Sequence, residues 1–322
     1  MALIAGVDGG NTKTVAVVCD LEGRALGIGR GGCGNWEAIG EAKAAQVITE
    51  VVAQALAAAG GAHADLAHAH MGLAGLDWPD DEPRLRKALA GAGWGCALTL
   101  ENDSFLAVRA CAPEGHGIGV TAGTAVASGI LRPDGEKYFY GGFTDLGGGF
   151  DIDAQTVHAV IRAEDGRGPS TALAAALLRA TGHASVSALV YEMHRRGYHA
   201  PHAMVRPVLF ATAAQGDPVA VDIATRFGAE LALCATNLMR RYELLEKDPA
   251  VVAAGSLFTR TGPLLFEVFR QQVLRAAARA QVMLADQPPV MGAVRGALAA
   301  CGRDQPEAWE RARQSASAQG WV

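Results

Sequence analysis

The sequence predicts an α/β protein with about two domains, and three observations lead to this fold class. First, the chain has 322 residues, more than a single domain of ordinary size. Second, short apolar runs typical of buried strands are interspersed with longer segments whose apolar residues recur at helical spacing. Third, a unit of strand, glycine-rich turn and strand begins near residue 2 and again about 115 residues later, which indicates a duplicated architecture.

The first half of the chain is predicted to begin with a β-meander, followed by alternating helices and strands. Its helix at 36–59 is rich in alanine and is ended by the pair Gly60-Gly61. The predicted strands are 2–7, 15–19, 25–29, 67–73 and 98–100, and the other helices are 82–90 and 104–111.

The second half opens with the repeated unit and is then mostly helical. Strands are predicted at 118–122, 126–131 and 251–254, with a hairpin turn at 133–135. The predicted helices are 152–164, 170–180, 185–196, 201–214, 217–245, 256–280 and 291–300. The polar tail after Gly302 is expected to be partly disordered. The best place for a domain boundary is near Pro113-Glu114-Gly115.

Composition excludes several classes of protein. The net charge is −5 and no basic stripe is present, so we expect no nucleic-acid partner. No apolar stretch reaches the roughly 20 residues of a membrane span, and the N-terminus lacks a signal-peptide pattern. The six cysteines are scattered without a CxxC pair, as expected for reduced thiols. These features predict a cytoplasmic protein that acts without a membrane.

Glycine is the outlier of the composition. The 40 glycines are about 12% of the chain, against an average near 7%. They gather in clusters between apolar runs, which indicates tight turns and a backbone that lies close to a ligand.

The segment from Asp8 to Thr14 (sequence DGGNTKT) joins the first two strands and is the strongest candidate for chemistry. Glycines allow backbone N–H groups to approach an anion, and the threonines and lysine add donors and charge. Asp8 follows a buried strand, where a carboxylate could orient a hydrated Mg²⁺. A plain hairpin turn with solvated polar residues explains the same pattern equally well.

Two later glycine-rich turns are weaker candidates. Gly123-Thr124 occupies the equivalent turn of the second unit, and two such turns facing each other could hold one polyphosphate. The segment 141–151 combines glycines, aromatic residues and two aspartates, as expected for a loop that lines a ligand. A plain loop is the alternative.

The pair Asn102-Asp103 stands between a strand and a helix. A carboxylate there could accept a proton from a substrate hydroxyl, but Asp and Asn are also preferred N-cap residues, and local pattern alone favours the cap. His63, His68 and His70 lack partners of a recognisable metal site and are predicted to lie in surface loops.

Taken in order, these motifs resemble those of the BadF/BadG/BcrA/BcrD-type ATPase family, which belongs to the sugar kinase, Hsp70 and actin superfamily. The resemblance covers the chain to about residue 300. The segments that carry it are Asp8 to Thr14, Asn35-Trp36, Asn102-Asp103, Ala122-Gly123-Thr124, residues 164–173, residues 254–258 and residues 288–293.

The resemblance implies two ribonuclease H-like, actin-like ATPase domains with a cleft between them, the second enriched in helices. Their expected bounds are 1–115 and 116–290, with 291–322 packing back toward the first. It implies ATP and Mg²⁺ as cofactors, with Asp8 toward the metal. It implies nucleotide contacts from Gly9, Gly10, Asn11, Thr12, Lys13, Thr14, Gly123, Thr124, Gly255 and Ser256.

The resemblance further implies an amino-sugar kinase acting on N-acetylglucosamine or a glucosamine-like hexosamine. Asp103 would take the proton from the sugar hydroxyl, and the expected sugar contacts are Asn35, Trp36, Asp103, Gly142, Phe143 and Asp145. A homodimer is compatible with the family. Two alternatives stay open: a sugar or nucleotide sensor without turnover, and an ATPase that activates another enzyme.

Overall fold

The computed structural model describes residues 1–91, 93–140, 146–199 and 202–321. Strands in this part of the chain form two five-stranded sheets. The first sheet contains β1 (Leu3–Gly9), β2 (Thr14–Asp20), β3 (Ala25–Gly31), β4 (Leu66–Leu73) and β5 (Ala97–Asn102). The second contains β6 (Gly117–Ala122), β7 (Val126–Leu131), β8 (Lys137–Phe139), β9 (Ala250–Ala254) and β10 (Gln281–Leu284). The predicted α/β class is confirmed.

The two sheets have the same topology. Their orders are β3-β2-β1-β4-β5 and β8-β7-β6-β9-β10, so corresponding strands occupy corresponding places. In each sheet the first three strands run antiparallel, and the fourth and fifth run parallel to the first. The repeated strand pattern of the sequence is therefore a repeated sheet.

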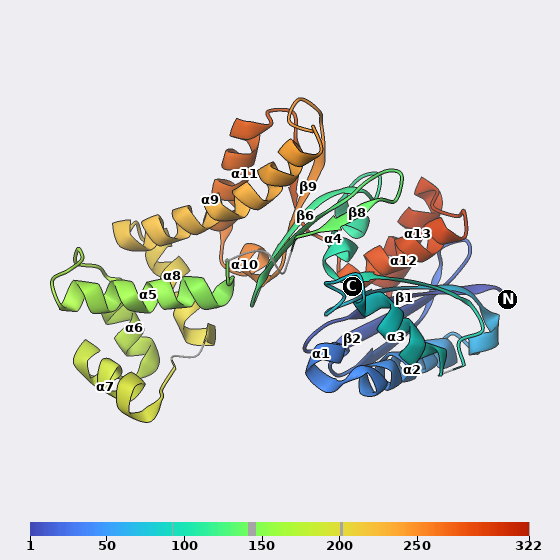
Figure 1. Ribbon diagram of the computed structural model, residues 1–322, viewed down its shortest axis with the longest axis horizontal. Helices are drawn as coiled ribbons and strands as arrows, with labels where there is room; N and C mark the ends of the chain where they lie inside the picture. The colour runs from blue at the N-terminus through green and yellow to red at the C-terminus, as the bar shows by residue number, and fades with distance from the viewer. Residues whose placement is uncertain (92, 141–145, 200–201, 322) are drawn as a thin grey trace.

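Helices connect and cover these strands. In the first half they are α1 (Trp36–Ile39), α2 (Glu41–Ala58), α3 (Asp81–Ala90) and α4 (Ser104–Cys111), with a short 3-10 turn at His63–Asp65. Between β8 and β9 lie α5 (Gly149–Glu164), α6 (Leu173–Thr181), α7 (Val186–Arg196), α8 (His202–Ala214) and α9 (Pro218–Arg241). The last are α10 (Ser256–Thr259), α11 (Pro263–Ala276), α12 (Pro289–Ala300) and α13 (Pro306–Ala318). Figure 1 shows α5, α6 and α7 at the end of the molecule opposite α12, α13 and the N-terminus.

Helices α4 and α12 cross between the two halves. Helix α4 follows β5 of the first sheet, yet its Phe105 and Val108 pack with Leu131 and Val252 of the second. Helix α12 follows β10 of the second sheet and packs on β1 and β2 of the first (Figure 1). The two helices also contact each other closely, because Gly292 lies against the backbone of α4. Each of these two helices therefore connects the carboxyl end of a strand in one sheet, β5 or β10, to the other sheet.

Several sequence predictions about elements are wrong. The predicted helix at 256–280 is divided into α10 and α11, because Gly262 and Pro263 interrupt it, and β10 then begins at Gln281. The tail after Gly302 forms α13, which buries a stripe of three alanines (Ala308, Ala312 and Ala316).

Among the described residues no single helix has the length and apolar character of a membrane span; only the bent pair α6–α7 meets that test jointly.

Two of the three histidines predicted in surface loops are buried on β4. His68 is 9% exposed and bonds Thr99 through Nε2 at 2.9 Å. His70 is 2% exposed, and its Nε2 lies 2.8 Å from Oε1 of Glu101 on β5. The prediction failed because both histidines have partners on the neighbouring parallel strand.

Glu101 is the centre of a buried ionic network that joins the two sheets. Besides His70, its carboxylate accepts hydrogen bonds from Arg109 of α4, at 2.7 and 3.0 Å, and from Lys137 of β8, at 3.1 Å. Strand β5 of the first sheet is thereby linked to β8 of the second, two residues before Asp103.

Candidate active site

A cavity of about 470 Å³ lies at the carboxyl ends of the parallel strands of both sheets. Its wall is built by residues at or just after the ends of β1, β4, β5, β6 and β9. Ligand sites in α/β proteins form at such strand ends because the following loops converge there. The wall contains four carboxylates, and no lysine or arginine occurs among the described residues that line it; the carboxylates belong to Asp8, Glu37, Asp77 and Asp103.

Asp103 lies in this wall directly after β5. It occupies the N-cap position of α4, but its side chain makes no capping hydrogen bond. Asn102 takes that role, since its Oδ1 accepts from the N–H of Ser104 at 2.9 Å. The capping interpretation of this segment is therefore confirmed for Asn102, while the Asp103 carboxyl group lines the cavity.

The electrostatic surroundings of Asp103 favour a protonatable carboxyl group. Burial, together with the nearby charges of Asp8 and Asp77, raises the pKa of Asp103 to about 7. A general base works best when its pKa is near the operating pH, because both its proton affinity and its deprotonated fraction are then substantial. Asp103 has the location and the proton affinity of such a base.

Asp77 and Asn102 hold one edge of this cavity in place. Asn102 Nδ2 donates to Asp77 Oδ1 at 2.7 Å and to the carbonyl of Leu76 at 3.3 Å. The N–H of Asp77 donates to the buried carboxylate of Asp81 at 2.9 Å. Burial and the charges of Glu37 and Asp81 raise the pKa of Asp77.

Asp8 is the wall residue best suited to a divalent cation. It lies near the end of β1, where burial raises its pKa to about 6 although the charge of Lys13 opposes the shift. Among the described residues no group of three or more His, Cys, Asp or Glu side chains forms a metal cage. Mg²⁺ needs no such cage, since it is commonly held by one or two carboxylates, phosphate oxygens and water. Asp8 fits that donor set.

The loop after β1 reaches the cavity through one of its predicted residues. Asn11 lines the wall, and its Oδ1 accepts from Nδ2 of Asn35 at 2.6 Å. Thr14 is fully buried and its hydroxyl donates to the carbonyl of Gly32 at 2.9 Å, so it supports the loop from behind. The remaining predicted members of the loop lie outside the wall: Gly9, Gly10, Thr12 and Lys13.

Asn35 and Trp36 anchor the opposite loop. Asn35 lines the cavity and caps α1, since its Oδ1 accepts from the N–H of Glu37 at 2.9 Å. Trp36 lies behind the wall, where its Nε1 donates to the carbonyl of Gly75 at 2.6 Å. The guanidinium of Arg84 covers the other side of the Trp36 ring at 4.4 Å. Trp36 thus positions the loop that carries Asp77.

The second glycine turn and Gly255 complete the wall. Gly123 and Thr124 line the cavity, and their carbonyls accept from the N–H of Gly149, at 2.9 and 3.1 Å, at the start of α5. Gly255 follows β9 with a φ of 94°, and a Cβ there would lie 2.3 Å from the carbonyl oxygen of Ala122. Only glycine allows this backbone to lie against the turn after β6.

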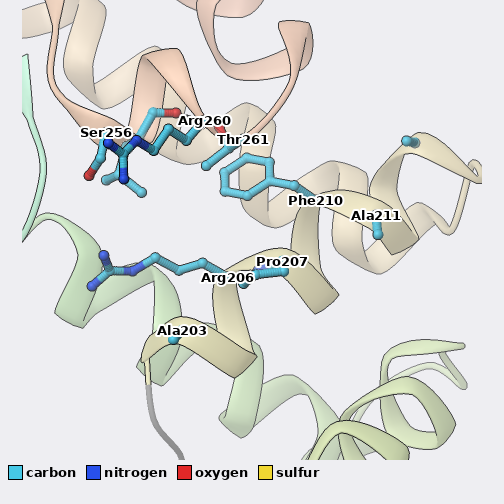
Figure 2. Close-up of a pocket in the computed structure, with 10 residues that line it drawn as sticks. Ala203, Arg206, Pro207, Phe210, Ala211, Ser256, Arg260 and Thr261 are labelled. Carbon is cyan, nitrogen blue, oxygen red and sulfur yellow. Dashed lines mark hydrogen bonds between the residues drawn. The ribbon is translucent and has the colours of Figure 1, made fainter.

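A second cavity of about 720 Å³ lies between α8 and the segment 256–261 (Figure 2). Ser256 lines this cavity rather than the first one. Figure 2 shows Arg206 and Arg260 on opposite walls, with their guanidinium groups at the end of the pocket where Ser256 lies. Ser256 directly follows Gly255 of the first cavity, so the two cavities adjoin at this turn.

Some site residues were missed by sequence reasoning. Glu37 and Asp77 line the first cavity and Arg206 lines the second. Asp77 closely follows the end of β4, and this position could have indicated a site residue. No sequence signal indicated Arg206, because it lies in the long helical segment. The predicted sugar contacts Gly142, Phe143 and Asp145 lie outside the described residues.

Known proteins are similar to this chain over most of its length. The chain is 24% identical over 315 residues to the N-acetyl-D-glucosamine kinase of Dictyostelium discoideum, covering 92% of this chain and 98% of that protein. A solved structure from Chromobacterium violaceum, assigned as an N-acetylglucosamine kinase, has a TM-score of 0.67 at 22% identity, covering 91% and 98% of the two chains. A ROK family glucokinase from Streptomyces griseus, solved with glucose and AMPPNP, has a TM-score of 0.58 at 21% identity, covering 97% and 100%.

The family assignment rests on most of the sequence. Residues 5–300 match the model of one family, and they include every strand of both sheets except the first two residues of β1. The same span contains the carboxylates and glycine turns of the first cavity. The chain belongs to the BadF/BadG/BcrA/BcrD ATPase family.

Proposed function

We propose that this protein phosphorylates an amino sugar with ATP, the acceptor being N-acetylglucosamine or a glucosamine-like hexosamine. The reaction takes place in a cleft between two actin-like domains, 1–115 and 116–290, with 291–322 packing back on the first. The observation that carries the proposal is Asp103, a carboxyl group with a pKa raised to about 7 in a cavity that is also lined by Asn11 and by the turn of Gly123 and Thr124. The amino-sugar kinase among its relatives supports the choice of acceptor.

Asp103 is the general base of the reaction. As the sugar hydroxyl attacks, its proton passes to the Asp103 carboxylate and its oxygen forms a bond to the γ-phosphorus. The bond between that phosphorus and the bridging oxygen breaks, and ADP leaves with the electron pair. Phosphoryl transfer needs mainly positioning and neutralisation of charge, and the walls of the cavity supply the positioning.

The nucleotide extends from the first cavity into the second. The hydroxyl of Thr124 and the amide of Asn11 face its phosphates, while the N–H groups of Gly10 and Gly123 hold their own turns through the carbonyls of Lys13 and Ala125. Gly255 allows close approach, and Ser256 leads to the adenosine in the second cavity. Asp8 would hold Mg²⁺, which neutralises phosphate charge when bound.

The sugar occupies the side of the first cavity formed by Asn35, Glu37 and Asp77. Their amide and carboxylate oxygens accept hydrogen bonds from sugar hydroxyls and orient one hydroxyl toward Asp103. Gly142, Phe143 and Asp145 are proposed as further sugar contacts.

The test is a coupled assay of ADP release with purified protein, ATP, Mg²⁺ and a panel of hexosamines. We expect release that depends on an amino sugar, with a phosphorylated sugar as the product by mass spectrometry. A panel without any turnover contradicts the proposal. Calorimetry then distinguishes the remaining case, since sugar or ATP binding without product indicates a sensor of the same fold.

A further inference from the structure

Arg206 is a cation in the wall of the second cavity with an unused hydrogen-bond donor. Its Nε donates to Oδ2 of Asp153 on α5 at 3.0 Å, and its side chain is 17% exposed. The Nη2 group is buried and has no hydrogen-bond partner among the described residues. A buried guanidinium N–H without a partner is costly, because it has lost its hydration without replacement.

The guanidinium of Arg206 rests against the N-terminus of α5. A Cβ built on Gly149 would lie 2.1 Å from its Nη2, so residue 149 must be glycine for the arginine to lie there. The start of a helix carries partial positive charge from its free N–H groups. The positive guanidinium of Arg206 and the positively polarised start of α5 therefore lie side by side. The nearby carboxylates are Asp153, which holds Nε, and Asp151, which accepts from the N–H of Gly147.

The same helix start is bonded to the second glycine turn. The N–H of Gly149 donates to the carbonyls of Gly123 and Thr124. The turn therefore contacts the start of α5, which in turn contacts the guanidinium of Arg206. Of the side chains at 124–126, only that of Thr124 carries a hydrogen-bond donor, because alanine and valine follow it. An anion on this turn would have few side-chain donors apart from the arginine.

We infer that Arg206 binds the β- or γ-phosphate of ATP, with Asp153 holding the guanidinium in position. The inference rests on the proposed function, since it assigns a further ligand to the same nucleotide. Arginine suits this role because its planar group offers several donors to one phosphate. A purely structural ion pair between α5 and α8 is the competing account.

The test compares Arg206→Met with Arg226→Met, a matched control whose arginine forms an exposed ion pair with Asp222 on α9. Calorimetry measures the affinity of each for ATP and for AMP. We expect Arg206→Met to weaken ATP binding about ten- to a hundredfold, as for loss of a charged hydrogen bond, and AMP binding by less than about threefold. The KM for the sugar is expected to stay within about twofold of the wild type.

Arg206→Lys keeps the positive charge but loses the planar guanidinium group with its several donors. It replaces Arg206→Met in the test if the methionine variant does not fold. A selective, smaller loss of ATP affinity in the lysine variant supports the inference. Equal effects on ATP and AMP, or no effect on either, overturn it in favour of the structural ion pair. A wild-type protein that binds neither nucleotide contradicts the proposed function and the inference with it.

Discussion

Two carboxylates near the end of strand β5, Glu101 and Asp103, are only two residues apart and have opposite electrostatic character. Burial disfavours the charged form of Glu101, but the hydrogen bonds and charges of His70 and Arg109 outweigh it and hold its pKa well below the ordinary range. Burial also disfavours the charged form of Asp103, and there the neighbouring charges of Asp8 and Asp77 add to it. The pKa of Asp103 therefore rises to about 7.

The difference shows that burial alone does not decide whether an acid is reactive. Glu101 is contacted by His70 of β4 and by two cations, Arg109 of α4 and Lys137 of β8, so it stays charged and joins the two sheets. Asp103 faces a wall without cations among its described residues and can exchange a proton near neutral pH. The sign of the neighbouring charges separates the structural acid from the one that we propose as the general base.

The largest effect is expected from Asp103→Asn. Removing a general base lowers kcat by about 10²- to 10⁴-fold, measured as ADP release with an amino sugar. Asp248→Asn is the control, because Asp248 is exposed at the far end of β9. More than a tenth of the wild-type kcat in Asp103→Asn would show that Asp103 is not the base.

Asp103→Asn is also expected to change the thermal stability of the unliganded protein. Because the folded pKa of Asp103 is raised, its contribution to stability is fully present below about pH 4 and is lost as the pH rises through about 7. At pH 8 the charged carboxylate destabilises the unliganded protein, and asparagine removes that charge. Thermal denaturation should give a higher Tm for Asp103→Asn at pH 8, by about 2–4 °C for each kcal/mol relieved.

Glu101→Gln is expected to change stability rather than chemistry. It removes the buried negative charge that Arg109 and Lys137 contact, and breaking a pair of this kind typically costs about 3–5 kcal/mol in the free energy of unfolding. Urea denaturation at pH 7 measures this loss. Since the folded pKa of Glu101 is lowered, its contribution disappears as the pH falls below about 4.5, so the variant and wild type should converge in acid.

The control for Glu101→Gln is Glu41→Gln, which breaks the exposed pair of Glu41 and Arg84. Such pairs are worth about 1 kcal/mol or less. If the two variants lose equal stability at pH 7, the network around Glu101 is not the link between the sheets that we describe.

The smallest effect is expected from Lys137→Met. Lys137 contributes the outermost contact to Glu101, at 3.1 Å, and its side chain is 30% exposed. Water screens this pair, and His70 and Arg109 still hold the carboxylate, so we expect a loss of about 1 kcal/mol or less in urea denaturation. A loss as large as that of Glu101→Gln would mean that the cross-sheet contact dominates the network.

Much of the architecture was predictable because its signals are local. Apolar runs ending in glycine or aspartate marked the strand ends that form the cavity, including those before Asp8, Asp103 and Gly123. Helix α4 was predicted at its observed bounds, because its apolar run begins directly after polar residues.

The rest depended on contacts that no local pattern reveals. Strand β10 exists because Val282 pairs with Val251 on β9, far away in the sequence. Helix α13 is held by a stripe of small alanines, which resembles an ordinary polar tail in sequence. Local pattern could not show which residue at the start of α4 provides the cap, since either Asn102 or Asp103 could have done so.

The most direct test of the contrast on β5 is a ¹³C NMR titration of the side-chain carboxyl groups. Asp103→Asn and Glu101→Gln identify the two signals by their loss. The account predicts that Asp103 in the unliganded protein titrates near pH 7, while the pKa of Glu101 lies well below that of an ordinary glutamate. An Asp103 signal that titrates near pH 4, like an ordinary exposed aspartate, would contradict it.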